Sequence, residues 1–421
     1  MDSKNPDHIA EPSAWSIKNF RLYTYAGILL PFVAQVQSLI VGWQIYEIKH
    51  DPLYLGLIGL TEAAPALSLA FITGYIVDRS SPLFVFKNVA RLALFAAFML
   101  VIISNPWRPF TPDQRLPFIY GAAFLAGVGR AFRMPAVVAL IPRLVPRNVL
   151  HVSSAWNASG FNIASAVGPA LGGFLFAWKG APLPYTLDFF LLIVAVGLVS
   201  LIKIDETRNL NPKSTAISFF NDLTLGLRYV FRHPLLLSAL ALDMFAVLFG
   251  GAVAMLPIYA AEILFTGPIG LGILRSAPAA GSLLMSLILI RFPVNRQAGK
   301  ILLSCVAGFG FCMIGFGLSR LFWLSAFLLF LGGSFDSVSV VIRSAIVQLA
   351  SPPEIRGRIG AVNSIFIGIS NQLGEFESGV AAKLLGLVPS VVIGGIVTLV
   401  VVGFTTLKTP KLRGMDLTDL R

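Results

Sequence analysis

The stretch ALIPRLVPRNVLHVSSAWNASGFNIASAVGPALGG, from Ala139 to Gly173, has a related copy 206 positions further along the chain. The copy reads AIVQLASPPEIRGRIGAVNSIFIGISNQLGEFESG and runs from Ala345 to Gly379. Positions that match under this shift include Pro146 and Pro352, Ala155 and Ala361, Asn157 and Asn363, Gly168 and Gly374, and Gly173 and Gly379. Because the shift is close to half the chain, the two halves are interpreted as a duplication with weak internal symmetry.

Composition places the chain in the membrane. Of its 421 residues, 56% are hydrophobic and only 12% are charged, whereas a soluble domain carries roughly 25% charged residues. A water-soluble fold could not bury so much apolar surface, so we expect an all-α membrane protein. Cys305 and Cys312 are seven positions apart on one expected helix and are interpreted as packing residues, because a disulfide or metal role needs further partners.

Apolar runs of about 20 residues, long enough to cross a bilayer, recur along the chain. We expect twelve transmembrane helices, at approximate ranges 22–46, 54–77, 84–104, 117–141, 153–178, 184–203, 235–262, 267–290, 300–318, 321–347, 359–385 and 387–407. The predicted units are an N-terminal six-helix bundle over 1–204, a connector over 205–234 and a C-terminal six-helix bundle over 235–421. The first 17 residues contain no apolar stretch, so a removable signal peptide is not expected.

The distribution of Lys and Arg predicts the orientation. An even number of spans places both termini on one side, and most cationic residues fall in segments on that side. The opposite loops hold Lys49, Arg108, Arg115, Lys179 and Arg320. Because cytoplasmic loops carry the excess of cationic residues, the termini and the connector are predicted to be cytoplasmic.

The connector has a loop-forming part and a helical part. It begins with DETRNLNPKS, which is rich in turn formers, and continues as SFFNDLTLGLRYVFRHP. In the second part Phe219, Leu223, Leu227 and Val230 recur at helical spacing. We expect an amphipathic helix at the cytoplasmic interface that links the two halves.

Two motifs lie in the N-terminal half. GYIVDRSSPLFVFK, from Gly74 to Lys87, joins spans two and three. Gly74 permits a close helix contact, and Asp78 offers an anion to the helix N-terminus near Arg358. Such a contact would latch the halves together on the cytoplasmic side, and a surface pair of Asp78 with Arg79 is the alternative.

The second motif is GPALGG in span five, from Gly168 to Gly173. Pro169 bends the helix, whereas Gly168, Gly172 and Gly173 thin it for tight packing. The expected partner is span eight at residues 278–281, which are equally small.

These motifs resemble signatures of the major facilitator superfamily. Gly74, Asp78 and Arg79 match its Gly-x-x-x-Asp-Arg loop, although Pro-Leu follows where the family usually has basic residues. GPALGG is similar to the glycine–proline motif of its antiporters, with Ala164 in place of the usual preceding glycine. The wider wording, including GRAFRMPAVVALIPRLVPR and SPPEIRGR, looks like the branch that contains the enterobactin exporter and related secretion or multidrug proteins. The resemblance implies two pseudo-symmetric bundles around a central cavity, alternating access, and a preference for export.

Charged side chains inside the spans indicate a structural or functional role, because placing each one at bilayer depth costs a free energy from about 2.5 kcal/mol upward. They are Glu62, Arg130, Arg133, Asp188, Asp243, Arg275, Asp336, Arg343, Glu375 and Glu377. The internal repeat aligns Asp336 with Arg130, and in the resembled fold spans four and ten face one another. We therefore predict that Arg130 and Asp336 pair across the cavity in one conformation. Pairing within each half, for instance of Asp336 with Arg343, is the alternative.

Five carboxylates are candidates for proton coupling, namely Asp243, Glu62, Glu375, Glu377 and Asp336. A partly apolar cavity favours the neutral form of a carboxyl group, so such a group can exchange a proton near neutral pH. Asp243 is expected to face span one. Glu375 and Glu377 lie about 200° apart on a helix, so they cannot both face the cavity.

Polar residues on the expected cavity-lining spans are candidates for contacting a substrate: Gln35, Gln37, Ser38, Arg133, Asn157 and Asn363. The four His lie in tails and loops, so no metal site is indicated. No GxxxxGK[ST] phosphate loop is present, so ATP hydrolysis by that route is not indicated. We expect no catalytic residues and no cofactor, with a transmembrane proton gradient as the energy source.

We therefore expect a secondary active transporter, not an enzyme, that exports a small amphipathic compound of siderophore or drug type against proton entry. Import of a small solute such as an iron–siderophore complex is a second interpretation, and a non-transporting sensor or lipid-handling protein is a third. The expected partners are the substrate and the lipid bilayer, without nucleic acid. The chain is expected to act as a monomer in the cytoplasmic (inner) membrane.

Overall fold

The computed structural model describes the chain apart from residues 1–13, 106–109, 147–148, 205–215, 353–354 and 421. Within the described segments, the side chains of residues 14, 70–71, 74–75, 78, 151, 216–223, 361, 369 and 419–420 are also outside the description. Everything below concerns the described residues.

The described chain is helical and divides into two sets of long helices. The N-terminal set is α1 (Lys18–Lys49), α2 (Pro52–Arg79), α3 (Pro82–Ser104), α4 (Pro112–Leu144), α5 (Leu150–Lys179) and α6 (Pro182–Ser200). The C-terminal set is α8 (Pro234–Gly250), α10 (Gly267–Arg291), α11 (Ala298–Leu318), α12 (Phe322–Leu349), α13 (Arg356–Leu385) and α14 (Leu387–Lys408). The predicted all-α class and the six-plus-six layout of spans are confirmed.

Eleven of these segments, as far as they are described, are long and apolar enough to cross a membrane. The twelfth, α13, has the required length but a lower hydropathy, because it carries Asn363, Asn371, Gln372, Glu375 and Glu377. The polar residues of the second repeat copy therefore fall on the one long helix with the weakest membrane signal.

Local sequence explains where several helices begin and break. Proline occupies the first turn of α2, α3, α4, α6 and α8, where its missing N–H needs no helical partner. Span seven, predicted as continuous over 235–262, is interrupted after Gly250. It continues as η3 (Ala252–Met255), α9 (Leu256–Ile258) and the π-helical η4 (Tyr259–Ile263). A pair of glycines followed by Pro257 weakens regular α-helix there.

The remaining elements are short or lie outside the bundles. They are η1 (Ala14–Ser16), α7 (Ala216–Arg232) in the connector, α15 (Pro410–Arg413) and η5 (Leu417–Leu420). The expected connector helix is thus present. It lies against α13 and also contacts α2, so it touches both halves.

The internal repeat is visible in the helix boundaries. Shifting α5, Leu150–Lys179, by 206 positions reproduces the bounds of α13, Arg356–Leu385. Both helices are 30 residues long. Each ends at a glycine with positive φ, 68° at Gly180 and 91° at Gly386, a conformation that favours glycine because it has no Cβ. The duplication therefore extends to the turns that end these helices.

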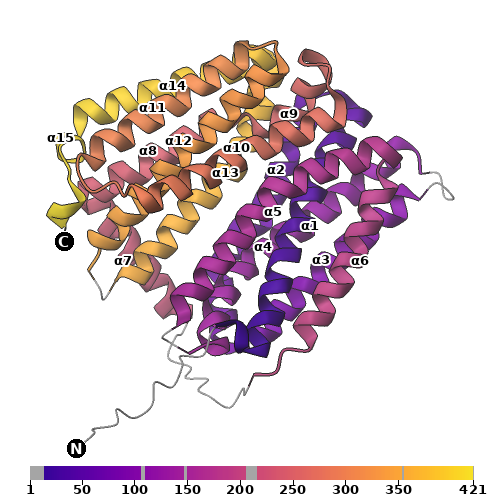
Figure 1. The fold of residues 1–421 in the computed structure, drawn as a ribbon, viewed down its shortest axis with the longest axis horizontal. Helices are drawn as coiled ribbons and strands as arrows, with labels where there is room; N and C mark the ends of the chain where they lie inside the picture. The colour runs from indigo at the N-terminus through magenta and orange to yellow at the C-terminus, as the bar shows by residue number, and fades with distance from the viewer. Residues whose placement is uncertain (1–13, 106–109, 147–148, 205–215, 353–354, 421) are drawn as a thin grey trace, which may run out of the picture.

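Each half has its own apolar core. One buried cluster lies in the N-terminal half and includes Phe20 and Leu192. Another lies in the C-terminal half, with contributions from α7 and from the residues after α14, and includes Leu236 and Ile342. Figure 1 shows the two bundles side by side, indigo to magenta and orange to yellow. In that view α7 lies below α8 and α13. We call the helix ends near α7 the terminal side and the opposite ends the far side.

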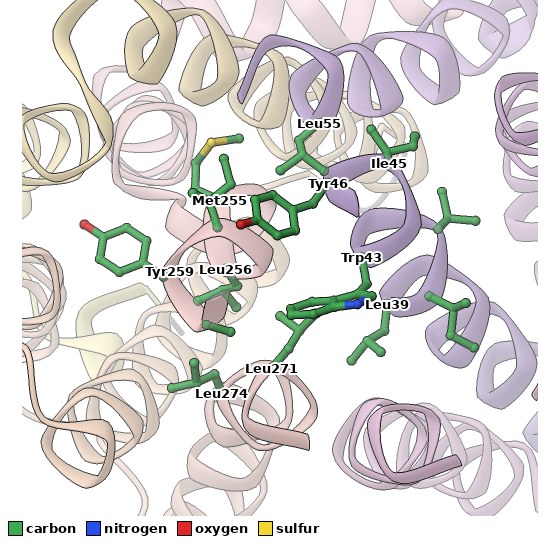
Figure 2. Close-up of a cluster of buried hydrophobic side chains, with 14 of the residues drawn as sticks. Leu39, Trp43, Ile45, Tyr46, Leu55, Met255, Leu256, Tyr259, Leu271 and Leu274 are labelled. Carbon is green, nitrogen blue, oxygen red and sulfur yellow. The ribbon is translucent and has the colours of Figure 1, made fainter. Parts of the chain in front are cut away.

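A third buried cluster joins the halves on the far side. Figure 2 shows Tyr46 and Trp43 of α1 close to Met255 and Leu256 of span seven and to Leu271 of α10. On the terminal side, by contrast, the α5 residues 154–156 and 158–159 are exposed. The halves are therefore packed together on the far side, while α5 is uncovered on the terminal side.

Candidate functional site

The most extensive helix crossings between the halves are those of α5 with α10 and of α2 with α13. At the first crossing, a Cβ placed on Gly173 would lie 2.3 Å from the carbonyl oxygen of Pro268 and 3.1 Å from Cα of Gly272. Gly168 and Gly172 pack on α1 within the same half. The prediction that GPALGG allows tight packing is confirmed, and its partner in the other half is span eight.

The predicted contact region on span eight was wrong. The contact lies at Pro268–Gly272, and Gly281 instead packs on the backbone of Phe330 in α12. Gly281 lies about 14 Å further along α10 than Gly272. Because α5 and α10 meet near their far-side ends, residues deeper in α10 are available to pack within their own half.

The second crossing has the same glycine contact but also carries charge. A Cβ on Gly56 would lie 2.9 Å from Cα of Gly379. One turn along, a Cβ on Gly59 would lie 2.9 Å from Oε2 of Glu375. The carboxyl group of Glu375, which belongs to α13, therefore packs against Gly59 of α2, about one helical turn from Glu62.

Glu62 and Glu375 belong to a group of four charges. Nη2 of Arg130 is 2.6 Å from Oε2 of Glu62. Arg275 donates from Nη2 to Oγ of Ser38 at 2.6 Å and from Nη1 to the Ser38 carbonyl at 3.3 Å. The charged groups that act on Arg275 are Glu375, Glu62 and Arg130. We call Glu62, Arg130, Arg275 and Glu375 the four-charge cluster. Each half contributes one carboxylate and one guanidinium to it.

The predicted pair of Arg130 with Asp336 is not formed in this conformation. Arg130 binds Glu62 in its own half, and its side chain is 57% exposed. Asp336 makes no ion pair within the described part of the chain. Pairing within each half describes this conformation, and pairing of Arg130 with Asp336 in another conformation stays a prediction.

A second polar centre lies inside the C-terminal bundle, where Arg343 of α12 and Asp243 of α8 form an ion pair. Both side chains are buried. Asp243 lines a small cavity together with Asp336, Ser339 and Cys305. The cavity has a volume of about 10 Å³, room for about one water. The expectation that Asp243 faces α1 is therefore not met, because the buried Arg343 takes it as counter-ion. The alternative partner for Arg343, Asp336, was also wrong.

Glu375 and Glu377 point to different neighbours, as their spacing predicted. Glu375 faces α2 in the other half, whereas Glu377 lines a small cavity with Gly251 and Ser390 of its own half. The next residue, Ser378, donates a hydrogen bond to the Gly251 carbonyl at 3.0 Å.

The substrate-lining candidates lie in several places. Gln35 donates to Ser165 at 2.7 Å, which ties α1 to α5, and Ser38 binds Arg275. Gln37 and Asn363 each have a buried polar atom without a hydrogen-bond partner in the described structure. Asn157 accepts a hydrogen bond from the hydroxyl of Tyr23 at 3.2 Å. The side chain of Arg133 is electrostatically coupled to Tyr23 and to Arg130.

Further polar contacts connect the halves at the far side. The hydroxyl of Tyr46 donates to Oε1 of Glu262 at 3.0 Å. Lys383 of α13 forms an ion pair with Asp51, which also caps α2 by accepting from the backbone N–H of Leu53. The hydrogen bond from Lys383 lowers the pKa of the Asp51 carboxyl below its ordinary value.

The Gly74–Arg79 motif ends α2 on the terminal side. The side chains of Gly74 and Asp78 lie outside the described residues, and Arg79 is exposed. Gly226 of α7 packs closely on the start of α13, because a Cβ added at Gly226 would lie 3.0 Å from the carbonyl oxygen of Arg358. The start of α13 is thus covered by α7, and the latch with Asp78 stays a prediction.

Sequence reasoning missed the contacts of two residues, Arg275 and Tyr23. Arg275 was noted as an intramembrane charge, but nothing in the sequence indicated that it binds Ser38 of span one. Tyr23 carried no signal either, because tyrosines near the ends of spans are common at membrane interfaces. Both were found only because helices from distant parts of the chain bring these residues together.

The two halves are thus bundles of long helices joined at two glycine crossings, one of which carries charges. Solved structures of membrane transporters share this fold. The chain resembles a D-xylose–proton symporter with a TM-score of 0.74 and 13% identity, over 96% of this chain and 100% of that one. It also resembles an inward-facing, unoccupied bacterial homologue of the human lysosomal transporter Spinster, with a TM-score of 0.68 and 14% identity, over 96% and 99% of the two chains.

Sequence relatives specify the family. Residues 12–421 match the family described as transmembrane secretion effector, and the chain belongs to this family. It is 21% identical to macrolide efflux protein A of Streptococcus pyogenes over 89% of this chain and 91% of the relative. It is 24% identical to the enterobactin exporter EntS of Shigella boydii over 83% of each. The recognition made from the motifs is confirmed, and the protein is a multi-pass membrane transporter.

Proposed function

We propose that the protein is a proton-coupled exporter of a small amphipathic compound, working by alternating access without a cofactor. The terminal side is the cytoplasmic side in this proposal, as the Lys and Arg distribution predicts. The relatives include a macrolide efflux protein and an enterobactin exporter, which supports export as the direction. The conformation described here is then open toward the cytoplasm and closed toward the outside.

The observation that carries the proposal is the position of Glu62 and Glu375. They lie at the crossing of α2 with α13, which must separate when the outer side opens. A carboxyl group at such a crossing is buried in one conformation and reaches outside water in the other. This is the condition for taking up a proton on one side and releasing it on the other.

The other carboxylates fit a coupling role less well. Asp243 is neutralised by Arg343 inside one half, and Glu377 faces its own half. Opening between the halves need not expose either of them. We therefore place the primary coupling step at Glu62 and Glu375, with Asp336 as a further site beside the C-terminal cavity.

The test combines secretion and reconstitution. Compounds secreted under iron limitation are compared between cells with and without the protein, and the compound that differs is then assayed in proteoliposomes. We expect flux driven by an opposing proton gradient and abolished by a protonophore. Flux that does not depend on the proton gradient would refute proton coupling. The absence of any protein-dependent compound or flux would refute export.

A further inference from the structure

We infer that the outer face of α7 binds acidic phospholipid in the membrane leaflet on the terminal side, with Arg228 and Arg232 on the headgroups and Leu227 and Phe231 against the lipid chains. The partner of this surface is therefore a bilayer that contains anionic lipid. The inference goes beyond the proposed function and does not depend on the direction or the coupling of transport.

The inner face of α7 is fixed to the C-terminal half, which defines the orientation of the helix. A Cβ on Gly226 would lie 3.0 Å from the carbonyl oxygen of Arg358 at the start of α13. The hydroxyl of Tyr229 donates to the carbonyl oxygen of Ala350 at 3.4 Å, and Val230 is fully buried. These contacts turn the opposite face of α7 away from the protein, and we call it the outer face.

The outer face carries an apolar strip beside a cationic strip. Leu227 and Phe231 are 39% and 58% exposed, and Arg228 and Arg232 are also exposed. The members of each pair are four positions apart and share a strip, and the two strips lie about 100° apart around the helix axis. Neither arginine forms an ion pair within the described part of the chain. An apolar strip bordered by exposed cations matches the boundary between lipid chains and headgroups.

The end of α7 lies where a membrane span begins. Only His233 separates α7 from the span that starts at Pro234. His233 accepts a hydrogen bond from the backbone N–H of Leu236 at 3.4 Å and stacks on the ring of Tyr229, with centroids 5.7 Å apart. Arg232 is therefore held beside the first turn of a transmembrane helix, at the depth of the lipid headgroups.

The charge of the outer face favours acidic over zwitterionic lipid. The described side chains of α7, at residues 224–232, include two arginines and no carboxylate. Each cation near an acidic leaflet strengthens binding about fivefold. A zwitterionic headgroup carries no net charge to attract these arginines, so we expect acidic lipid to gather at α7.

The test compares two lipids within one bilayer composition. The full-length protein with Leu227→Cys, in a background without the two native cysteines, carries a fluorophore on the introduced thiol. Nanodiscs contain equal amounts of phosphatidylcholine and phosphatidylglycerol, and a nitroxide quencher is attached to the chains of one lipid or of the other. We expect both lipids to quench the fluorophore, with a preference for phosphatidylglycerol of at least about fivefold at low salt.

Variants of the labelled protein show whether the arginines cause the preference. Arg228→Gln combined with Arg232→Gln should abolish it, whereas Arg228→Lys combined with Arg232→Lys should keep most of it. Lys179→Gln is the control, because it removes an exposed cation from the far-side end of α5 and should leave the preference unchanged. Thermal unfolding shows whether each variant is folded.

High salt provides a second measurement on the labelled parent, which serves if the glutamine variant does not fold. Salt screens the charges and should reduce the preference. Equal quenching by the two lipids, or no quenching by either, would overturn the inference. So would a preference that survives both glutamine substitutions or that is unchanged at high salt.

Discussion

The two crossings between the halves share a glycine contact and differ in charge. Gly173 meets Gly272 where α5 crosses α10, and Gly379 meets Gly56 where α13 crosses α2. Gly173 and Gly379 are equivalent in the internal repeat, so the duplication preserved the contact itself. The charge is not shared by the two copies, because Glu375 on α13 is aligned with Pro169 on α5. Both crossings bring glycines of the two halves into contact, while only the crossing of α2 with α13 carries the carboxylates for which we propose proton coupling.

The largest effect is expected from breaking either crossing sterically. In Gly173→Leu and in Gly379→Leu, the Cβ of the new side chain would lie less than 3.0 Å from backbone atoms of the other half. Overpacking of this kind costs about 1–3 kcal/mol. We expect transport to fall at least about tenfold in both variants, since about 1.4 kcal/mol corresponds to a factor of ten.

This prediction is measured with a reporter cysteine and compared with a control variant. A reporter cysteine, Ala382→Cys, replaces a residue that is buried near the far side, in a background without the two native cysteines. We expect faster labelling from outside in both glycine variants. Gly403→Leu is the control, because a Cβ at Gly403 meets nothing within 4 Å. Unchanged labelling in the glycine variants would show that the crossings do not hold the outer side closed.

The second prediction concerns the carboxyl group that distinguishes the crossing of α2 with α13 from the crossing of α5 with α10. Glu375→Gln keeps the size of the side chain but cannot release a proton, so we expect transport to lose its dependence on the proton gradient while downhill flux persists. Pro169→Ala, at the equivalent position of the uncharged crossing, should change the rate without changing the proton dependence. Flux is measured in proteoliposomes across imposed pH gradients. A similar loss of proton dependence in both variants would contradict the division between the crossings.

A smaller effect is expected from the ion pair of Arg130 with Glu62. Its atoms are 2.6 Å apart, but the Arg130 side chain is 57% exposed, and exposed pairs contribute about 0.2–1 kcal/mol. A double-mutant cycle with Arg130→Gln and Glu62→Gln, followed by thermal unfolding, should give a coupling in that range. A coupling near zero would show that Glu62 is held in place by α13 instead.

The smallest effect is expected at the ion pair of Asp51 with Lys383, which lies at the outer end of the charged crossing. The pKa of Asp51 is lowered by the hydrogen bond from Lys383. The stabilisation of the closed outer side is therefore present above the ordinary pKa range of aspartate and is lost as pH falls through the lowered value. Because the Lys383 side chain is 50% exposed, salt screens the pair.

We expect Lys383→Gln to increase labelling of the same reporter cysteine by less than about twofold at low salt. High salt should remove the difference between this variant and the parent. An equally large difference at high salt would indicate that Lys383 acts through packing of its aliphatic part.

Much of the fold could be predicted because it depends on local properties. Apolar runs located twelve spans, and the repeat anticipated that α5 and α13 are equivalent, which their matching bounds confirm. Cys305 and Cys312 are both buried in apolar clusters, as their position on one helix indicated. The break in span seven was missed because hydropathy does not register the loss of regular helix at glycine and proline.

The partners of the charged residues could not be predicted in the same way. Arg130 was assigned to Asp336 from the repeat, but it binds Glu62 on a neighbouring helix. Helical spacing shows which residues share a face, as it did for Glu375 and Glu377, but it does not show which helix that face meets. Asp243 and Arg343 illustrate this, because they are far apart in the sequence and adjacent in the bundle.

The sequence by itself determined the membrane environment, the twelve spans, the duplication and the transporter family, because these follow from composition, periodicity and motifs. Only the tertiary structure decided that the two equivalent glycines each cross to the other half, and that Glu62 and Glu375 lie together at one of these crossings. The physical reason is that electrostatic contacts act over a few ångströms between helices that are distant in the chain, and spacing along one helix carries no information about those distances.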